Sequence, residues 1–376
     1  MTHVSQLFFE LVRAGLWGTE GKSSTLTEAE MEEIVQLAEE QAVEGLVLEG
    51  IERLMSLGVG DRIDIPLEQK LQLIGDVQII EHENVKMNRF VAQLFKKLQD
   101  AGIDALLVKG QGIAQCYEKP LWRVSGDVDL LLDKDNYQKA AEYLSTEASS
   151  VDEEDPDRLH LGMAIANWTV ELHGTLRSGL WGSVDRVIDD LQAETFERHE
   201  VRKWENGDVD VPLPAENNDV VFVFSHIIQH FFKEGIGLRQ ICDWCRLLWT
   251  YRDTIDVALL ESRLRMMRVM TEWKVFAGLA VEYLGMPVEA MPLYSDDKRW
   301  KRKAVRVMDF VLETGNFGHN RDYSYYEKYP KLVFKAISLW RHCKDFVKYL
   351  RIFPLDSFKV WYGMIVLGIR TIARGQ

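Results

Sequence analysis

The chain has 376 residues, of which 47% are hydrophobic and 28% are charged, as is usual for a globular protein with sizeable cores. Its formal net charge of −14 argues against a general nucleic-acid binder, which carries a basic surface. The N-terminal residues show no secretory signal pattern, and the apolar stretch at residues 360–369 is too short to cross a bilayer. The chain has four cysteines, which fit reduced thiols. We therefore expect a cytoplasmic protein with no membrane partner.

Residues 1–100 carry apolar side chains at helical spacing and are predicted to form an N-terminal helical region. One helix is expected over residues 5–16. Thr27 and Glu30 form a capping-box pattern that opens a second helix. A long apolar stripe predicts a third helix over residues 67–100, closed by Gly102.

Residues 101–212 change character and are predicted to form a small α+β core of about four strands. Strands are expected over residues 103–108, 128–132, 159–165 and 167–172, with the last two as a hairpin. Helices are expected from the turn at residue 110 to about residue 118 and over residues 136–144, and residues 149–157 are expected to be a loop. In the last strand, Thr169, Glu171 and His173 should share one face.

Residues 213–376 return to helical patterns and are predicted to form a C-terminal helical domain. The expected helices begin at residue 218 and cover residues 238–249, 262–284, 300–314, 330–349 and 356–373. The predicted class is thus α+β, a small mixed-sheet core embedded between N- and C-terminal helical segments.

Asp127 and Asp129 open the second predicted strand and are the strongest candidates for a functional site. Residues at i and i+2 of a strand project from the same face, while Val128 and Leu130 point into a core. Two acids held side by side repel each other unless a cation lies between them. The pattern therefore predicts a divalent-metal site.

A turn that contains glycine precedes this strand, and it predicts a phosphate contact. Lys109 and the segment Gly110-Gln111-Gly112 lie where a strand turns into a helix, which presents backbone N–H groups to an anion. Gly126 directly precedes the acids and lets the backbone approach a ligand closely. The turn and the paired acids together support a nucleotide site more strongly than either does alone.

These motifs resemble the nucleotidyltransferase superfamily that includes polymerase β and the aminoglycoside nucleotidyltransferases. The closer resemblance is to a bacterial family of uncharacterised nucleotidyltransferases with a Lys-Gly turn and an Arg-x-x-Gly-Asp-x-Asp-Leu-Leu segment, here residues 123–131 (RVSGDVDLL). The family's later acid-Leu-His strand matches residues 171–173, and its Gly-Leu-Arg-x-x-x-Asp segment matches residues 237–243. This chain departs from the superfamily at Gly110-Gln111, where Gly-Gly or Gly-Ser is common.

The resemblance implies a role for each matching residue. Asp127 and Asp129 would hold the metal bound to the triphosphate, and Glu171 would complete a second metal site and help to deprotonate an acceptor hydroxyl. The nucleotide would contact a second group of residues, namely Lys109, Gly110, Gln111, Arg123 and Gly126. His173 and Arg239 are candidates for the acceptor side or the cleft wall.

Simpler interpretations stay open for several of these side chains. Glu171 fits an exposed strand residue as well as a ligand. Lys109 and Arg123 could form structural ion pairs with the acidic cluster, and Arg239 could pair with Asp243 at i and i+4 of one helix. The further pair His226 and His230 lacks a His-Glu-x-x-His pattern, so it predicts a partly buried helix face rather than a metal site.

The sequence therefore predicts an enzyme that depends on Mg²⁺, with Mn²⁺ as the alternative ion. It would move a nucleoside monophosphate, AMP from ATP by resemblance, to a hydroxyl of a small molecule or protein and release pyrophosphate. The acidic charge makes a nucleic-acid partner less favoured. Two alternatives are a nucleotide-binding scaffold of the same fold without turnover, and a protein modifier of the toxin–antitoxin type.

Overall fold

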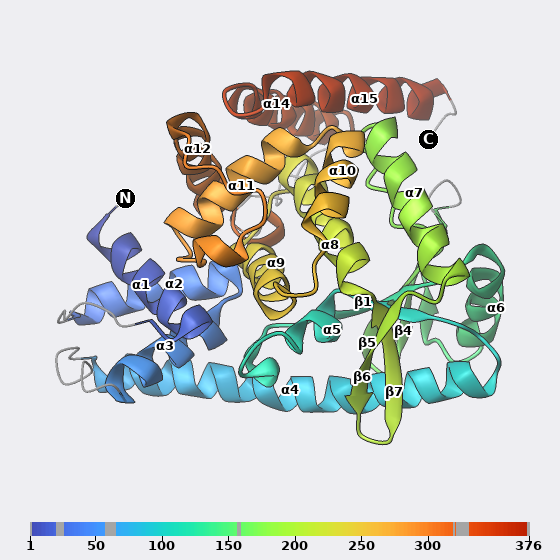
Figure 1. Ribbon diagram of the computed structural model, residues 1–376, viewed down its shortest axis with the longest axis horizontal. Helices are drawn as coiled ribbons and strands as arrows, with labels where there is room; N and C mark the ends of the chain where they lie inside the picture. Colours follow the sequence, from blue (N-terminus) through green and yellow to red (C-terminus); the bar gives the residue numbers. More distant parts are fainter. Residues whose placement is uncertain are drawn as a thin grey trace.

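A five-stranded mixed sheet lies among helices that precede and follow it in the chain, with a two-stranded ribbon beside it (Figure 1). The computed structural model describes residues 2–19, 26–56, 65–155, 159–318, 320 and 331–373. The strands are β1 (Leu106–Val108), β2 (Asp127–Leu131), β3 (Ser150–Val151), β4 (His160–Ile165), β5 (Trp168–His173), β6 (Val201–Asn206) and β7 (Val209–Pro214). The predicted α+β class is confirmed.

The larger sheet has the order β1-β2-β5-β4-β3. Its neighbours pair antiparallel except β2 and β5, which run parallel. The predicted hairpin of β4 and β5 is confirmed, and its inward residues Val170 and Leu172 are fully buried. The sheet thus brings two strands that lie some forty residues apart in the sequence into direct contact.

The helices form most of the remaining structure and surround the sheet (Figure 1). They are α1 (His3–Trp17), α2 (Glu28–Gln41), α3 (Glu44–Ser56), α4 (Leu67–Asp100), α5 (Gly110–Ala114), α6 (Lys134–Ser145), α7 (Gly182–Glu197), α8 (Glu216–Lys233), α9 (Leu238–Thr250), α10 (Val257–Met267), α11 (Met270–Glu282), α12 (Lys298–Thr314), α14 (Lys331–Leu350) and α15 (Pro354–Ala373). Short 3-10 turns are η2 (Pro120–Trp122), η3 (Val288–Ala290) and η4 (Asn316–Gly318).

Three predicted elements differ from the structure, the first two for an identifiable local reason. The strand expected over residues 103–108 is shortened to β1, because the amide of Asp104 bonds the side chain of Asn136 instead of a strand. The helix expected over residues 262–284 is broken into α10 and α11 by Arg268, which adopts a left-handed conformation with φ of 62°. The helix expected to reach residue 118 ends at Ala114.

The sequence patterns do not predict several other elements. β3 lies inside the expected loop at residues 149–157, of which residues 156–157 fall outside the described part. The sequence patterns also predict neither α3 nor α7 nor the β6–β7 ribbon. Asn206 pairs with Val209, so the ribbon turns at Gly207-Asp208, and the φ of 64° at Gly207 suits a two-residue hairpin turn.

Helix α4 connects the two hydrophobic cores. It has 34 residues and so is about 51 Å long, and it runs beneath the N-terminal helices and the strands in Figure 1. Leu73 and Val77 lie in one core with the helices, whereas Phe90 and Leu94 lie in the other core with the sheet. The division at residues 100 and 212 stays a prediction; residue 212 falls within β7.

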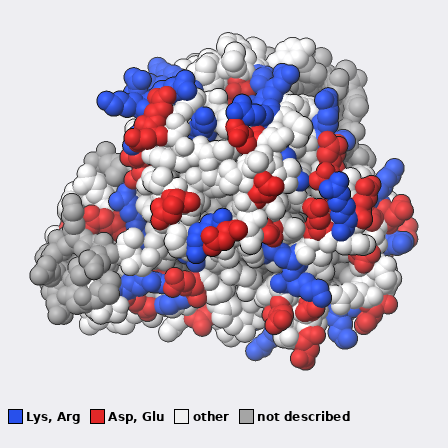
Figure 2. Space-filling view, in the orientation of Figure 1, with Lys and Arg blue, Asp and Glu red and all other residues white. Residues whose placement is uncertain are grey.

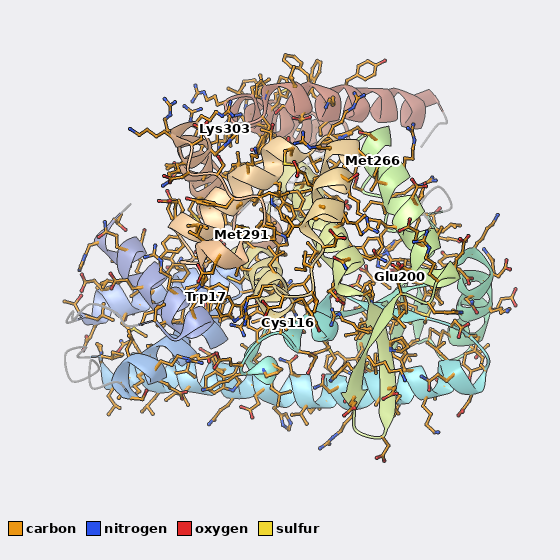
Figure 3. All side chains as sticks on the ribbon, in the orientation of Figure 1. Trp17, Cys116, Glu200, Met266, Met291 and Lys303 are labelled. Atoms are coloured by element: carbon orange, nitrogen blue, oxygen red, sulfur yellow. The ribbon has the colours of Figure 1, made fainter. Side chains whose placement is uncertain are left out.

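The N-terminal helices pack on helices from the end of the chain. Arg13 Nε donates to the Tyr283 carbonyl at 2.7 Å, and Trp17 Nε1 donates to the Leu284 carbonyl at 2.6 Å. The Trp17 ring also meets Trp249 of α9 edge-on at 5.5 Å between centroids, and Figure 3 shows Trp17 at this junction. Residues far apart in sequence therefore build one continuous core.

The surface carries both charge signs, with a local gathering of cations. Figure 2 shows acidic and basic side chains interspersed and a cluster of basic ones over α12, whose sequence begins KRWKRK. Figure 1 places α12 across α11 from the strands, so this cluster is remote from the acids of β2. Within the described part of the chain, no helix is both long enough and apolar enough to span a membrane.

Candidate active site

The parallel pairing of β2 and β5 brings the three predicted acids together. Its register sets Asp127 opposite Thr169 and Asp129 directly opposite Glu171. Ligand atoms of Asp127, Asp129 and Glu171 all lie within 4.8 Å of one another. On the other face of β2, Val128 and Leu130 are buried in the core, as the alternation predicts. The burial of Val128 and Leu130 thus anchors β2 and holds Asp127 and Asp129 on its opposite face.

Lys109 occupies a strained position at the turn between β1 and α5. Its φ of 59° and ψ of −146° lie in a region that residues with a side chain rarely adopt, at a cost of about 1–3 kcal/mol. This backbone directs Nζ to 3.1 Å from Asp129 Oδ1. The Lys109 side chain is 23% exposed and that of Asp129 only 4%. The strain is therefore tied to a charged contact within the acid cluster.

Gln111 lies on the opposite side of this turn. Its side chain is buried, and Nε2 donates to Asn84 Oδ1 on α4 at 2.7 Å. Asn84 in turn donates to the carbonyls of Leu121 and Arg123, both at 2.7 Å. The Gln111 side chain thus belongs to a buried polar network that fixes the approach to β2, whereas Gly110 lines the cleft. The residue that departs from the superfamily turn has a structural partner on α4.

Arg123 forms a buried ion pair with Asp243 of α9. The contacts are bidentate, with Nε to Oδ1 at 2.8 Å and Nη2 to Oδ2 at 2.7 Å. The side chains are only 6% and 5% exposed. Tyr117 also donates to Asp243 at 2.8 Å, and Arg123 Nη1 reaches Ser125 Oγ at 2.8 Å. Asp243 is therefore the partner of Arg123, and the pair connects the segment that enters β2 to α9.

Arg239, one turn earlier on α9, also faces this region. Its Nη1 donates to the Val124 carbonyl at 2.9 Å, two residues before Gly126. Burial lowers the pKa of Arg239, and nearby Arg123 lowers it further. Both guanidinium groups thus line the same pocket as the acids, and the charge of Arg123 is balanced by Asp243.

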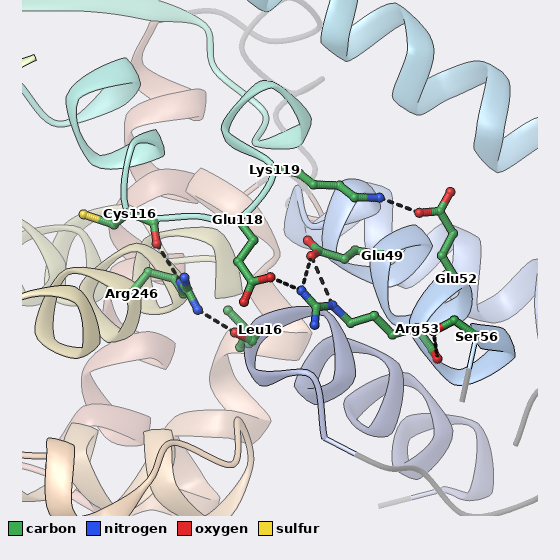
Figure 4. Close-up of polar contacts among 9 residues, drawn as sticks. All are labelled: Leu16, Glu49, Glu52, Arg53, Ser56, Cys116, Glu118, Lys119 and Arg246. Carbon is green, nitrogen blue, oxygen red and sulfur yellow. Dashed lines mark hydrogen bonds and ion pairs between the residues drawn. The ribbon is translucent and has the colours of Figure 1, made fainter. Parts of the chain in front are cut away.

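The segment between α5 and η2 is held by charged groups of α3 and α9 (Figure 4). Arg246 of α9 donates to the Cys116 carbonyl at 2.8 Å and to the Leu16 carbonyl at 2.6 Å. The ion pairs join Arg53 to Glu49 and Glu118, and Lys119 to Glu52. These contacts fix the chain that leads through Arg123 into β2.

Two histidines flank the third acid. His173 Nε2 lies 2.8 Å from Asp129 Oδ1 and 3.4 Å from Glu171 Oε2, and His160 Nε2 lies 3.3 Å from the same Glu171 oxygen. Hydrogen bonds from His160 and His173 lower the pKa of Glu171 far below its usual range. Burial disfavours protonated His173, but Asp129 and Glu171 outweigh it and raise the pKa of His173.

The two acids of β2 have opposite shifts. Partial burial and the charge of Asp129 raise the pKa of Asp127. Burial also acts on Asp129, but Lys109 and His173 outweigh it and hold the pKa of Asp129 below its usual value. Burial opposes the charge of Lys109, yet Asp129 raises the pKa of Lys109. The cluster therefore favours a cation beside Asp129, whereas Asp127 still lacks compensation.

A cleft with two lobes surrounds these groups. One lobe, of about 250 Å³, we call the Asp127 lobe; the other, of about 240 Å³, we call the His160 lobe. The Asp127 lobe is lined by Lys109, Gly110, Arg123, Asp127, Asp129 and Arg239, among others. The His160 lobe is lined by His160, His173, Thr175, Arg177 and Phe222, among others. Both lobes share Lys109, Glu171 and His226, so the acids lie where the lobes meet.

The sequence patterns predict the three acids of this site but not His160, although β4 alternation puts it on the face of Glu171. His226 and His230 are partly buried on one helix, as predicted, and His226 also lines both lobes. Burial lowers the pKa of His226 well below its usual value. The predicted Gly126 lies at the exposed entry to β2.

A strand that carries Asp-x-Asp beside a second strand that carries an acid is the arrangement implied by the resemblance to the polymerase β superfamily. The model of a family described as uncharacterised nucleotidyltransferases matches residues 27–285, more than half of the chain, and the chain belongs to this family. No curated protein matches the chain at a significant level.

Proposed function

We propose that the chain is a Mg²⁺-dependent nucleotidyltransferase that moves a nucleoside monophosphate from a nucleoside triphosphate to a hydroxyl of a small molecule or protein. ATP is the donor that the resemblance suggests, so the transferred group would be AMP. The observation that carries the proposal is the meeting of Asp127, Asp129 and Glu171 within 4.8 Å at the junction of two lobes.

The chemistry of these donors supports a divalent ion. Carboxylate oxygens are the ligands that Mg²⁺ prefers, and Mn²⁺ accepts the same donors. Repulsion between Asp127 and Asp129, visible in the raised pKa of Asp127, is relieved by a bound cation. Asp127, Asp129 and Glu171 would hold the ion, which when bound neutralises phosphate charge.

The Asp127 lobe suits the triphosphate. Arg239 lies on its wall and Gly110 leaves the backbone accessible, while Lys109 and Arg123 line it in ion pairs with Asp129 and Asp243 that would have to rearrange to meet phosphate. In the reaction, the acceptor oxygen forms a bond to the α-phosphorus, and the bond from that phosphorus to the bridging oxygen of the β-phosphate breaks. Pyrophosphate leaves with that bridging oxygen. Positioning and charge stabilisation by these side chains would supply much of the catalysis.

The His160 lobe suits the acceptor, because it opens on the other side of Glu171 and has both polar and apolar walls. The acceptor hydroxyl must lose a proton during attack. Glu171 was the sequence-based candidate for that role, but His160 and His173 hold its pKa low and weaken it as a base. His226 also lines both lobes, but burial lowers its pKa well below the usual value and weakens it as a base in the same way, so Glu171, where the lobes meet, is kept as the proposed proton acceptor.

A labelling experiment tests the proposal. The full chain is incubated with Mg²⁺, each α-³²P-labelled nucleoside triphosphate and a cell lysate, and labelled products and pyrophosphate are measured. Asp127→Asn and Asp129→Asn should lose label, because each removes a metal ligand without changing side-chain size. Asp210→Asn is the matched control, since Asp210 is an exposed acid on β7 that pairs with Lys203.

The distribution of label separates the alternatives. Label on a small molecule or on a protein supports transfer and identifies the acceptor class. Unchanged labelling in both Asp127→Asn and Asp129→Asn would contradict the proposal. Metal-dependent nucleotide binding without pyrophosphate release would show a scaffold instead of an enzyme and would also contradict it.

A further inference from the structure

His160, Glu171 and His173 form a second group of ligand-type side chains beside the three acids. Glu171 and His173 are two residues apart on β5 and share one face. His160 of β4 is the direct cross-strand partner of His173 in the β4–β5 register. Their ligand atoms lie within 4.8 Å of one another, and this group and the three acids share Glu171.

The distances around Glu171 are long for charge-assisted hydrogen bonds and also fit a metal. Its Oε2 lies 3.3 Å from His160 Nε2 and 3.4 Å from His173 Nε2. Charge-assisted N–H to carboxylate bonds are shorter, about 2.7–2.9 Å. A tetrahedral ion with bonds of about 2.0–2.1 Å separates its ligand atoms by about 3.4 Å. The two nitrogen–oxygen distances thus match the length of two edges of such a tetrahedron.

The donor set differs from that of the three acids. Two imidazole nitrogens and one carboxylate suit Zn²⁺ and other transition-metal ions, whereas Mg²⁺ prefers oxygen donors. Three protein ligands leave a fourth position for water or substrate. That position opens into the His160 lobe, where Thr175 and Arg177 also lie.

The same nitrogen of His173 also lies 2.8 Å from Asp129 Oδ1, a normal charge-assisted hydrogen bond. A proton that bridges His173 and Asp129 is therefore the competing arrangement. His160 distinguishes the two, because it contacts Glu171 and only packs against the His173 ring, at 4.9 Å between centroids, without a hydrogen bond to Asp129. Its side chain is 38% exposed, so its replacement leaves the core intact.

We propose that His160, Glu171 and His173 form a transition-metal site on the acceptor side of the cleft, next to the Mg²⁺ site that the three acids would form. The site binds Zn²⁺ through two imidazoles and one carboxylate and holds its open position toward the acceptor. This role in acceptor binding rests on the proposed function, whereas metal binding itself does not.

Calorimetric titration of the full chain with Zn²⁺ and with Mg²⁺ tests the site. We expect His160→Gln to weaken Zn²⁺ binding at least about 10- to 100-fold. A loss of that size follows the removal of a group that only hydrogen-bonds to a metal ligand, whereas His160 is proposed as a ligand itself. His82→Gln is the matched control, since His82 is exposed on α4. Both variants should unfold at the same temperature as the wild type.

Co²⁺ absorption provides a second measurement, which reports the coordination of the ion instead of its affinity. Tetrahedral Co²⁺ absorbs visible light much more strongly than octahedral Co²⁺, so the wild type and His82→Gln should show strong bands and His160→Gln weak ones. Equal Zn²⁺ affinity in His160→Gln and His82→Gln would overturn the inference, as would weak Co²⁺ absorption by the wild type. Neither result affects the labelling experiment, in which Asp127→Asn and Asp129→Asn test the transferase separately.

Discussion

Replacement of Asp243 by asparagine should destabilise the fold through the buried pair that it forms with Arg123. The two side chains are 5% and 6% exposed and are joined by hydrogen bonds of 2.7 and 2.8 Å. Asp243→Asn keeps the size of the side chain and removes only its charge. The Arg123 guanidinium then stays buried without its counterion.

Breaking a buried pair in this way costs about 3–5 kcal/mol. We expect the lower end, about 3 kcal/mol, because the amide oxygen still accepts one of the two hydrogen bonds. With a urea dependence of about 3 kcal/mol per molar, the midpoint of unfolding should fall by about 1 M. The midpoint is measured by far-UV circular dichroism and by tryptophan fluorescence.

Asp210→Asn provides the reference for an exposed pair. Asp210 and Lys203 are 52% and 65% exposed, and such pairs contribute about 0–1 kcal/mol. If Asp243→Asn shifts the midpoint no further than Asp210→Asn, the Arg123 pair does not stabilise the fold and the reasoning fails. Replacement of both members, Arg123→Met with Asp243→Leu, should recover most of the loss, because no charge is left buried.

Three further sets of variants test other features. Gly45→Ala should lower the free energy of unfolding by about 1–3 kcal/mol, because the added Cβ would lie 2.1 Å from the Trp122 carbonyl oxygen. Gly75→Ala should instead raise it by about 0.5–1 kcal/mol in the same urea assay, because no atom lies within 4 Å of the added Cβ. Lys109→Gly should be more stable than Lys109→Ala by about 1–2 kcal/mol, since both lose the ammonium and only glycine relaxes the φ of 59°; equal stability would contradict the strain. Burial raises the pKa of Glu44 to about 7 from its ordinary 4.5. The stability that the protonated carboxyl contributes to the fold is therefore fully present below about pH 4.5 and is lost as the pH rises through 7. Glu44→Gln cannot ionise and should exceed the wild type at pH 8 by up to about 3 kcal/mol, with no gain near pH 4.5; a gain that is independent of pH would refute this assignment.

The sequence was sufficient for the parts of the site that depend on local periodicity. Alternation in β2 separates Asp127 and Asp129 from Val128 and Leu130, and both sets lie as expected. The apolar stripe of α4 and the capping box at Thr27 likewise predict helices that the structure contains. These features follow from the geometry of a single element.

The remaining parts depend on contacts between elements. The register that sets Asp129 opposite Glu171 joins strands some forty residues apart, and no local pattern specifies it. The pairing of Arg123 with Asp243 spans 120 residues, and it displaces the simpler expectation that Asp243 pairs with Arg239 within α9. The hydrogen bond from Gln111 to Asn84 joins the turn to a helix that ends before the sheet begins, so no local pattern specifies it, and the phosphate contact of Gln111 stays a prediction.

The packing of α1 against α11 has a consequence for synthesis of the chain. Trp17 and its acceptor, the Leu284 carbonyl, are separated by 267 residues. At about 5–20 residues per second, a ribosome needs about 13–53 s to make the intervening chain. During that interval the side of α1 that later meets α11 has no final partner. We therefore expect a chaperone that scans nascent chains to contact α1 first and to leave it when α11 emerges.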